Sequence, residues 1–251
     1  MTFSLGYKTY NPTLVSADLS VPPDIFNMAT TTLLGITLTL TPTALSALRI
    51  APLLSSTASL THAYIEWLTN SAFLVPAPVD SSLSRFLLGP DAPPKAASQS
   101  ASAASAPDAE LERAKQLVVP EWFTNFFNTG VISVIGFNSV TLLSASLNLL
   151  FSEGLEASKV FYQAGLAAAV GHYAFVPLVG RSVRALTGLA AGRAQGGKTE
   201  GLKGKREGED IKAVEWVREW VGYHMVRMST VDALAWSSFA WGVVRAVTVT
   251  V

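Results

Sequence analysis

The sequence predicts an all-α integral membrane protein, in which four helices form a bundle and disordered loops connect them. Charged residues make up only 14% of the 251 residues, and the mean hydropathy is positive, at +0.36. Four apolar segments are each long enough for a bilayer core, which needs about 20 residues. The basic residues between these segments are also distributed unevenly in a way that a spanning protein requires.

The first predicted span is Ile25–Leu48, which is rich in threonine. Its alternating GITLTLT also fits a half-buried strand with a period of two. We favour a helix, because threonine hydroxyls can bond back to the preceding turn and are then tolerated in lipid. Pro42 is expected to kink this helix.

The other predicted spans are Trp122–Phe151, Val160–Gly180 and Trp216–Val249. Asparagine and serine in the second span indicate a helix that faces other helices rather than lipid all round. Small residues in the third span favour close contact between helices. The fourth span contains three ionisable side chains in an otherwise apolar run.

The connections differ in composition from the spans. Residues 76–107 are rich in Pro, Ala and Ser, and residues 192–210 are rich in Gly and in charge, so both are expected to be disordered. Leu60–Leu74 is interpreted either as an interfacial helix or as an extension after the first span. The whole chain, residues 1–251, is therefore predicted to form a single membrane domain.

Positive charge predicts the orientation. If the spans alternate in direction, the first and third connections share one side of the membrane and contain almost all the lysines and arginines outside the spans. The opposite side receives only Lys8 and Lys159. Because basic connections stay in the cytoplasm, both termini are predicted to be exoplasmic or luminal.

Three ionisable residues in the fourth span are the main candidates for a functional site: His224, Arg227 and Asp232. A charge near the centre of a bilayer costs roughly 2.5–3.5 kcal/mol unless it faces protein, water or a partner. At about 100° per residue, all three point into one half of a regular helix. A direct pair between Arg227 and Asp232 is not expected in such a helix, so a bridge through another helix is favoured, with His172 in the third span as a candidate.

The same residues also fit structural roles, and this alternative stays open. Arg227 can reach the interface, His224 can lie there in its neutral form, and Asp232 can pair for packing. A metal site is disfavoured, because His-x7-Asp on one helix lacks a compact ligand spacing.

Composition excludes several functional classes. The chain has no cysteine, so it has no disulfide and no thiolate metal site. Lys+Arg and Asp+Glu are equal at 18 each, which gives no reason to expect a nucleic-acid partner. The GxSxG and HExxH motifs of soluble enzymes are not found. Residues 192–199, GRAQGGKT, match the letters of a P-loop, but no hydrophobic strand leads into them and no helical pattern follows, so they are interpreted as part of a linker. The expected partners are the lipid bilayer and an apolar ligand, and a homo-oligomer stays open.

Short motifs in three of the spans resemble those of the anthrone oxygenase-like family of small four-span membrane proteins from polyketide pathways. The second span begins with a W…F…G pattern, the third contains H-aromatic…P, and the fourth begins with W…H…R. These positions are Trp122, Phe126 and Gly130; His172, Tyr173 and Pro177; and Trp220, His224 and Arg227. The long Ala/Ser-rich first connection departs from the family's pattern.

The resemblance implies a cofactor-independent oxygenase, which oxidises an anthrone-like aromatic polyketide with molecular oxygen. His172 or His224 would act as the base, Arg227 would stabilise the developing oxyanion, and Asp232 would orient the histidine or balance the arginine. Trp122, Asn125 and Tyr173 would contact the substrate. The alternative function is a non-catalytic membrane scaffold or transport helper, in which the same polar side chains hold the helices together.

Overall fold

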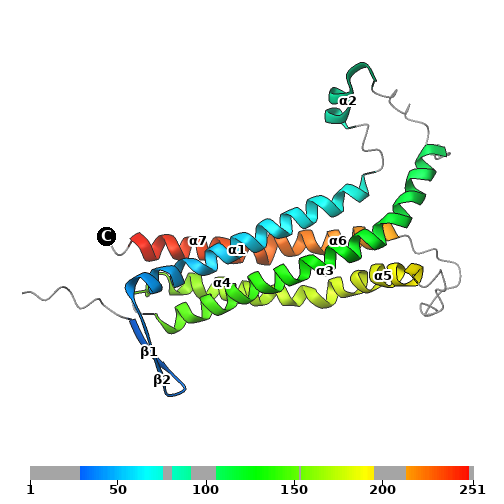
Figure 1. Cartoon of the computed structure of the whole chain (residues 1–251). Coiled ribbons are helices and arrows are strands. Elements are labelled where there is room, and N and C mark those ends of the chain that lie inside the picture. Colours follow the sequence, from blue (N-terminus) through cyan, green and yellow to red (C-terminus); the bar gives the residue numbers. More distant parts are fainter. Residues whose placement is uncertain (1–28, 76–80, 92–105, 153, 195–212, 249–251) are drawn as a thin grey trace, which may run out of the picture.

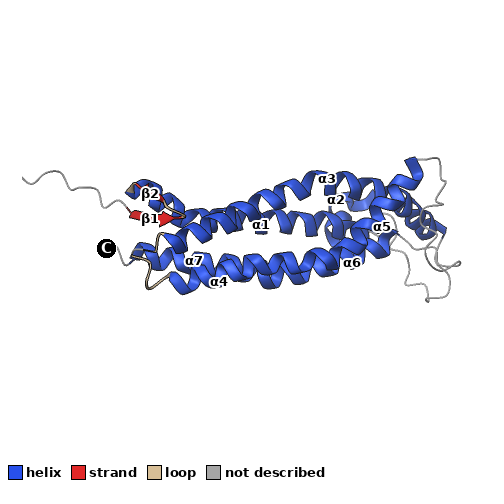
Figure 2. Ribbon diagram, turned by 90° about the horizontal axis from the view of Figure 1, so that it is seen from below, coloured by secondary structure: helices blue, strands red, loops and turns tan. Residues whose placement is uncertain are grey.

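Four long helical rods lie side by side in the computed structural model, which describes residues 29–75, 81–91, 106–152, 154–194 and 213–248 (Figures 1 and 2). The first rod is α1 and the second is α3, while the third and fourth each consist of two α-helices joined by an irregular turn. Their bounds are α1, Pro42–Ser71; α3, Ala106–Leu150; α4, Lys159–Gly171, η4, His172–Phe175, and α5, Val176–Ala194; α6, Ala213–Arg227, η6, Met228–Asp232, and α7, Ala233–Thr248.

The rods form an up-down-up-down bundle. Each rod packs on the next one in the chain, and the fourth returns to pack on the first, as α7 and α6 do against α1. This is the usual arrangement of four helices with sequential connections. The prediction of an all-α fold is confirmed, with one short hairpin added at the end of the bundle where α7 also ends (Figure 1).

The predicted helix over Ile25–Leu48 is wrong for residues 29–40, which form an antiparallel hairpin of β1 (Ala29–Leu33) and β2 (Ile36–Leu40). Leu34 and Gly35 both have positive φ, at 50° and 80°, which suits the tight turn of a two-residue hairpin loop. Threonine hydroxyls pair across the strands, 3.3 Å apart for Thr30 and Thr39. The period-two alternation, rather than the length of the apolar run, indicated the correct structure.

Pro42 begins a helix instead of kinking one. It is the first residue of α1, where its missing N–H is not needed, and the preceding Thr41 is extended with ψ 156°. The Thr41 side chain accepts a hydrogen bond from the Ala44 N–H at 3.3 Å and so caps the helix. The helix then continues through Leu60–Leu74, as α1 and η1 (Ala72–Leu74), which agrees with the extension alternative.

The remaining predicted spans fall within longer helices than the sequence suggested. The third rod continues through Gly180 to Ala194, so residues 192–194 of the second predicted loop are helical. In the first predicted loop, residues 81–91 form α2 (Ser82–Leu88) and η3 (Gly89–Asp91), and α3 starts at Ala106. The rest of both loops lies outside the described residues.

Pro52 lies inside α1 and leaves the Leu48 carbonyl without its usual donor. A proline has no N–H for the carbonyl four residues before it, and its ring crowds that carbonyl. Asn148 donates to the Leu48 carbonyl at 2.7 Å, and the Tyr162 hydroxyl donates to the neighbouring Arg49 carbonyl at 2.7 Å. A side chain from the second rod thus supplies the hydrogen bond that the proline removes, and one from the third rod adds another beside it.

Pro120 in α3 creates the same need at the other end of the bundle. The Arg193 guanidinium in α5 donates to the carbonyls of Gln116 and Leu117, which are the residues four and three positions before the proline. Both buried proline positions are therefore matched by donors on neighbouring rods, which also fixes the relative height of these rods.

Small residues let α4 and α7 approach closely, as predicted for the third span. A Cβ built on Gly165 would lie 2.6 Å from Phe239, and one on Gly242 would lie 3.1 Å from Tyr162. These contacts form one apolar core of the bundle, in which Phe239 and Tyr162 are completely buried.

Two helical segments are long and apolar enough to cross a membrane, as judged by length and composition: Glu110–Leu150 and Lys159–Ala194. Their most apolar windows have mean hydropathies of 1.6 and 1.2, and only 28% and 22% of those windows is buried inside the protein. Most residues of these two windows are therefore at least partly exposed.

We predict that Asn148→Ala destabilises the protein by about 1–3 kcal/mol, because the buried Leu48 carbonyl loses its donor. In a Pro52→Ala background the residue-52 N–H is restored as a donor for that carbonyl, so the same substitution should cost much less. Thermal unfolding in detergent, with Asn125→Ala on the exposed face of α3 as the control, measures both effects. An equal loss in the two backgrounds contradicts this account.

Candidate functional site

Six ionisable side chains from three rods meet inside the bundle and form what we term the buried ionic cluster. Two come from α1, one from η4, and three from α6 and η6. The members are His62 and Glu66; His172; and His224, Arg227 and Asp232. All are buried except His62, whose side chain is 24% exposed. The structure thus brings the four residues His172, His224, Arg227 and Asp232 together, as the sequence predicted.

Asp232 is the best-satisfied acidic group of the cluster. His172 Nδ1 lies 2.8 Å from one of its carboxylate oxygens, and Arg227 Nε donates to the other at 3.2 Å. Because the carboxylate can only accept, Nδ1 of His172 carries the proton and the lone pair is left on Nε2. This histidine is oriented as a general base would be, with a carboxylate holding the opposite ring nitrogen.

The direct contact between Arg227 and Asp232 corrects the expectation that they cannot pair within one helix. Met228–Asp232 is a π-helical turn, in which hydrogen bonds run from a residue to the fifth one along the chain. The wider turn brings the residues at positions 227 and 232 onto one side, whereas a regular helix separates them. Such turns are frequent at functional sites.

His172 reaches Asp232 because the third rod is also irregular. The 3-10 turn η4 follows α4, and Pro177 lies just after it, near the start of α5. Since Pro177 cannot donate to the Tyr173 carbonyl, the regular α-helical ladder is interrupted here. Two interrupted helices therefore meet at one level, and their irregular turns present His172 and Asp232 to each other.

His224 connects the fourth rod to α1. Its Nε2 donates to the Ala63 carbonyl at 2.8 Å, and its ring stacks on Trp220 at 4.7 Å between centroids. The Nδ1 atom faces Glu66 Oε2 at 3.7 Å, and Arg227 Nη2 lies 3.9 Å from the same oxygen. Arg227 is therefore placed between the two carboxylates of the cluster.

Glu66 and His62 were not among the predicted site residues. They are four residues apart on α1, which puts them on one face, with His62 Nε2 3.4 Å from Glu66 Oε1. The signal was the His-x3-Glu spacing in an otherwise uncharged segment, Leu60–Leu74. It was missed because the first span was placed too early in the chain, at Ile25–Leu48, which left Leu60–Leu74 as an interfacial helix or an extension after that span.

The three predicted substrate contacts lie apart from the cluster members, except for Tyr173. The Tyr173 ring is 41% exposed and packs edge-on against His172, with centroids 5.8 Å apart. Trp122 stacks on Phe126 of the same helix and also contacts the Phe73 ring, whereas Asn125 is exposed on α3. Of the three, Tyr173 is the one in contact with a cluster residue.

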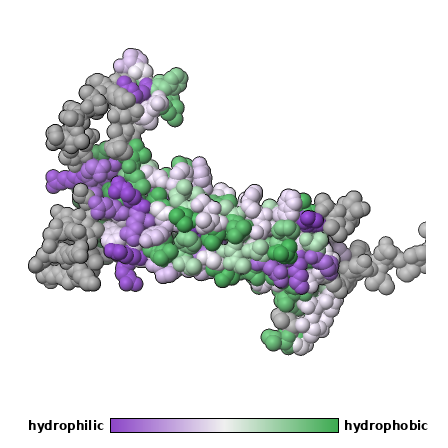
Figure 3. Space-filling view, turned by 180° about the vertical axis from the view of Figure 1, so that it is seen from behind, coloured by the Kyte–Doolittle hydropathy of each residue, from purple (hydrophilic) through white to green (hydrophobic). Residues whose placement is uncertain are grey.

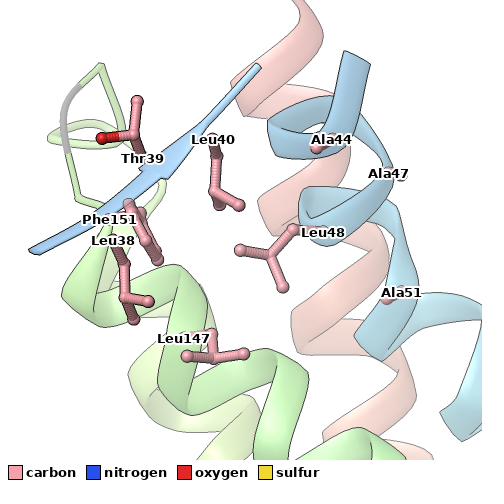
Figure 4. Close-up of a pocket in the computed structure, with 9 residues that line it drawn as sticks. All are labelled: Leu38, Thr39, Leu40, Ala44, Ala47, Leu48, Ala51, Leu147 and Phe151. Atoms are coloured by element: carbon pink, nitrogen blue, oxygen red, sulfur yellow. The ribbon is translucent and has the colours of Figure 1, made fainter. Parts of the chain in front are cut away.

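A pocket of about 450 Å³ lies at the hairpin end of the bundle, between β2, α1 and α3 (Figure 4). It is lined almost entirely by apolar side chains: Leu38, Thr39, Leu40, Ala44, Ala47, Leu48, Ala51, Leu147 and Phe151. Ala51 precedes Glu66 by 15 positions on α1, which is about 22 Å at 1.5 Å per residue. The pocket and the cluster are therefore separate features.

Comparison of the chain with protein-family models, curated proteins and solved structures finds no match. The resemblance to anthrone oxygenases thus depends on the sequence motifs alone and stays a hypothesis. Within the described ranges, no group of three or more His, Asp or Glu side chains is arranged to hold a metal ion.

We predict that Arg227→Met destabilises the protein by about 3–5 kcal/mol, because the buried Asp232 carboxylate loses the cation that pairs with it. The matched control is Arg218→Met, which removes an exposed arginine from the same helix and should change the stability little. Thermal unfolding of the two variants in detergent compares them directly. Similar stabilities of the two variants contradict the assignment of Arg227 to a tightly coupled cluster.

Proposed function

We propose that the chain is an integral membrane protein with four spans, and that the buried ionic cluster lies within the bilayer core. The charge distribution supports this. In each rod a long central stretch has no charged side chain apart from the cluster members Glu66, Arg227 and Asp232. These stretches are residues 50–71, 122–150, 160–180 and 220–244. About 20 such residues cross a bilayer core.

Apolar side chains also project outward from all four rods. More than half of each of these side chains is exposed: Leu54 and Leu68; Ile132 and Leu143; Val160 and Val176; Leu234 and Val244. Hydrophilic side chains gather toward the ends of the molecule, most of all at the α5–α6 end (Figure 3). Exposed apolar side chains on all four rods, with hydrophilic ones toward the ends, are typical of a surface that lipid covers.

Only the second and third rods are apolar enough to be recognised as spans by composition. The first and fourth rods contain five of the six cluster members, and these residues lower the mean hydropathy of both rods. Since those side chains are buried against one another, lipid need not solvate them. The polar content of these two rods is therefore compatible with a place in the bilayer.

For the activity, we propose a cofactor-independent oxygenase in which His172 acts as the general base. Its contact with Asp232 at 2.8 Å is the observation that best supports this role, because the carboxylate orients the ring and stabilises the imidazolium. Arg227 has further N–H groups besides the one that it donates to Asp232, and these can stabilise an oxyanion.

The reaction class follows from the family resemblance. His172 would remove a proton from the acidic methylene group or the phenol of an anthrone-like substrate, which leaves an electron-rich enolate. Molecular oxygen then takes four electrons from the methylene carbon: one oxygen atom becomes the new carbonyl, and the other leaves as water with the two methylene hydrogens. The substrate supplies all the electrons, so the balance needs no further reductant.

A non-catalytic scaffold is the second candidate. The observations in its favour are that Asp232 is fully paired and that the apolar pocket lies about 22 Å along α1 from the cluster. In this function the cluster aligns three rods and binds no substrate. The two candidates differ in whether a change that preserves assembly abolishes turnover.

Cysteine labelling tests the topology, because the chain has no native cysteine. Ser82→Cys in α2 and Ala157→Cys between α3 and α4 both place an exposed thiol at opposite ends of the bundle. In intact cells or sealed vesicles, an impermeant maleimide should reach only one of the two, and residue 82 is predicted to be cytoplasmic. Labelling of both from the same side, or recovery of the protein in the soluble fraction without detergent, contradicts the proposal.

Oxygen uptake with an anthrone as substrate tests the activity. His172→Ala should lower the turnover about 10²–10⁴-fold, which is the usual contribution of a general base. Arg218→Met serves as the control, and membrane extraction with detergent confirms that each variant is assembled. Turnover by His172→Ala at the wild-type rate, or no turnover by the wild type, favours the scaffold.

A further inference from the structure

Glu66 is the acidic member of the cluster whose contacts remain unexplained. Three nitrogen atoms surround its carboxylate: His62 Nε2 at 3.4 Å, His224 Nδ1 at 3.7 Å and Arg227 Nη2 at 3.9 Å. An N–H···O hydrogen bond is normally about 2.7–3.2 Å long, so none of these contacts is one. Asp232, by comparison, accepts two hydrogen bonds.

The tautomer of His224 makes this arrangement more unusual. Its Nε2 donates to the Ala63 carbonyl, which can only accept, so the neutral ring has its lone pair on Nδ1. That lone pair faces a carboxylate oxygen of Glu66, and both atoms are acceptors. Neither His62 Nε2 nor His224 Nδ1 has a hydrogen-bond partner, although both atoms are buried. Two buried acceptors in contact require a proton between them or a change of charge.

The charge balance of the cluster leads to the same requirement. With both carboxylates ionised, Arg227 positive and the histidines neutral, the cluster has one net negative charge. An uncompensated charge inside a protein is expensive, and more so within a bilayer core. One bound proton makes the cluster neutral.

We propose that Glu66 is a proton-binding site, which holds a proton as a neutral carboxylic acid and exchanges it through His62. Asp232 does not need the proton, since two donors already satisfy it. On Glu66, the O–H group can donate toward His224 Nδ1 or His62 Nε2, which supplies a donor for the unpartnered nitrogens. A neutral acid beside a neutral imidazole also avoids the cost of burying a separated ion pair.

His62 is the exchange route because it is the cluster member that is most exposed, at 24% of its side chain, against 8% for Glu66. Each transfer breaks the O–H bond of Glu66 as an N–H bond forms at His62 Nε2, and the Nδ1–H bond of His62 then breaks as its proton passes to a water molecule. On the α3 side, Gly130 provides room, since a Cβ there would lie 3.3 Å from Glu66 Oε1. The Phe137 ring packs edge-on against His62.

The ionisable groups that face Glu66 come from the first and fourth rods. His62 is on its own helix, His224 and Arg227 are on α6, and Asp232 with its partner His172 lies beyond Arg227. The charge on Arg227 favours ionised Glu66, but this cation is shared with Asp232 at shorter range. The proposal does not depend on the oxygenase activity, and it applies equally to a scaffold.

Infrared spectroscopy tests the proposal, because a carboxylic acid has a C=O stretching band that a carboxylate lacks. The purified protein in detergent at neutral pH should show this band. Labelling all glutamates with ¹³C should shift the band, and Glu66 is the one glutamate buried in the described ranges. Glu66→Gln should abolish the band, and Glu121→Gln, on the exposed face of α3, should leave it.

The labelled wild type decides the question even if Glu66→Gln does not fold. Absence of the band at neutral pH overturns the proposal, and so does a band that shifts with ¹³C-aspartate instead of ¹³C-glutamate. His62→Phe tests the route: the shift of the band after transfer into D₂O should become slower than in the wild type. Tyr64→Phe, on the exposed face of the same helix, is the control, and equal exchange in the two variants overturns the role of His62.

Discussion

The position of Arg227 between two buried carboxylates is the constraint on which the rest of the bundle depends. Its Nε donates to Asp232 at 3.2 Å, and its Nη2 lies 3.9 Å from Glu66. A guanidinium that cannot be deprotonated must keep acidic partners when it is removed from water. The first and fourth rods therefore have one relative height, and His172 holds the third rod at the same level through Asp232.

Buried backbone carbonyls also need partners, and two prolines create this need at two other heights in the bundle. Pro52 and Pro120 each remove a donor from a helix interior, and side chains of other rods replace it. In an apolar surrounding, an unpaired carbonyl costs as much as an unpaired side chain, so each proline acts as a specific contact point. The bundle is thus aligned at both ends by carbonyl acceptors and near the middle by charges.

The site depends on irregular turns in two of the rods, which allow His172 and Asp232 to form a hydrogen bond. A hydrogen bond between His172 and Asp232 joins the 3-10 turn His172–Phe175 to the π-turn Met228–Asp232, and each turn departs from the regular helical position of its ionisable side chain. In both cases the cost of the irregular backbone is offset by a buried hydrogen bond between His172 and Asp232. Glu66 differs, since a regular helix presents it to the cluster without a close donor.

The sequence alone determined the all-α class, the presence of small residues for close helix contact in the third span, and the shared direction of His224, Arg227 and Asp232. These follow from composition and from helical periodicity, which are local properties. The alternation in GITLTLT also offered a strand, although a helix was favoured there.

Only the tertiary structure decided which side chains meet. The Arg227–Asp232 contact requires a π-turn, which cannot be recognised from the types of residue in the sequence. Glu66 belongs to the cluster because α1 begins at Pro42, so that its second half lies at the same height in the bundle as Arg227. The donors for Pro52 lie on rods that are distant in the sequence. Such pairings depend on the relative heights of the helices, which packing sets for the bundle as a whole and no local pattern records.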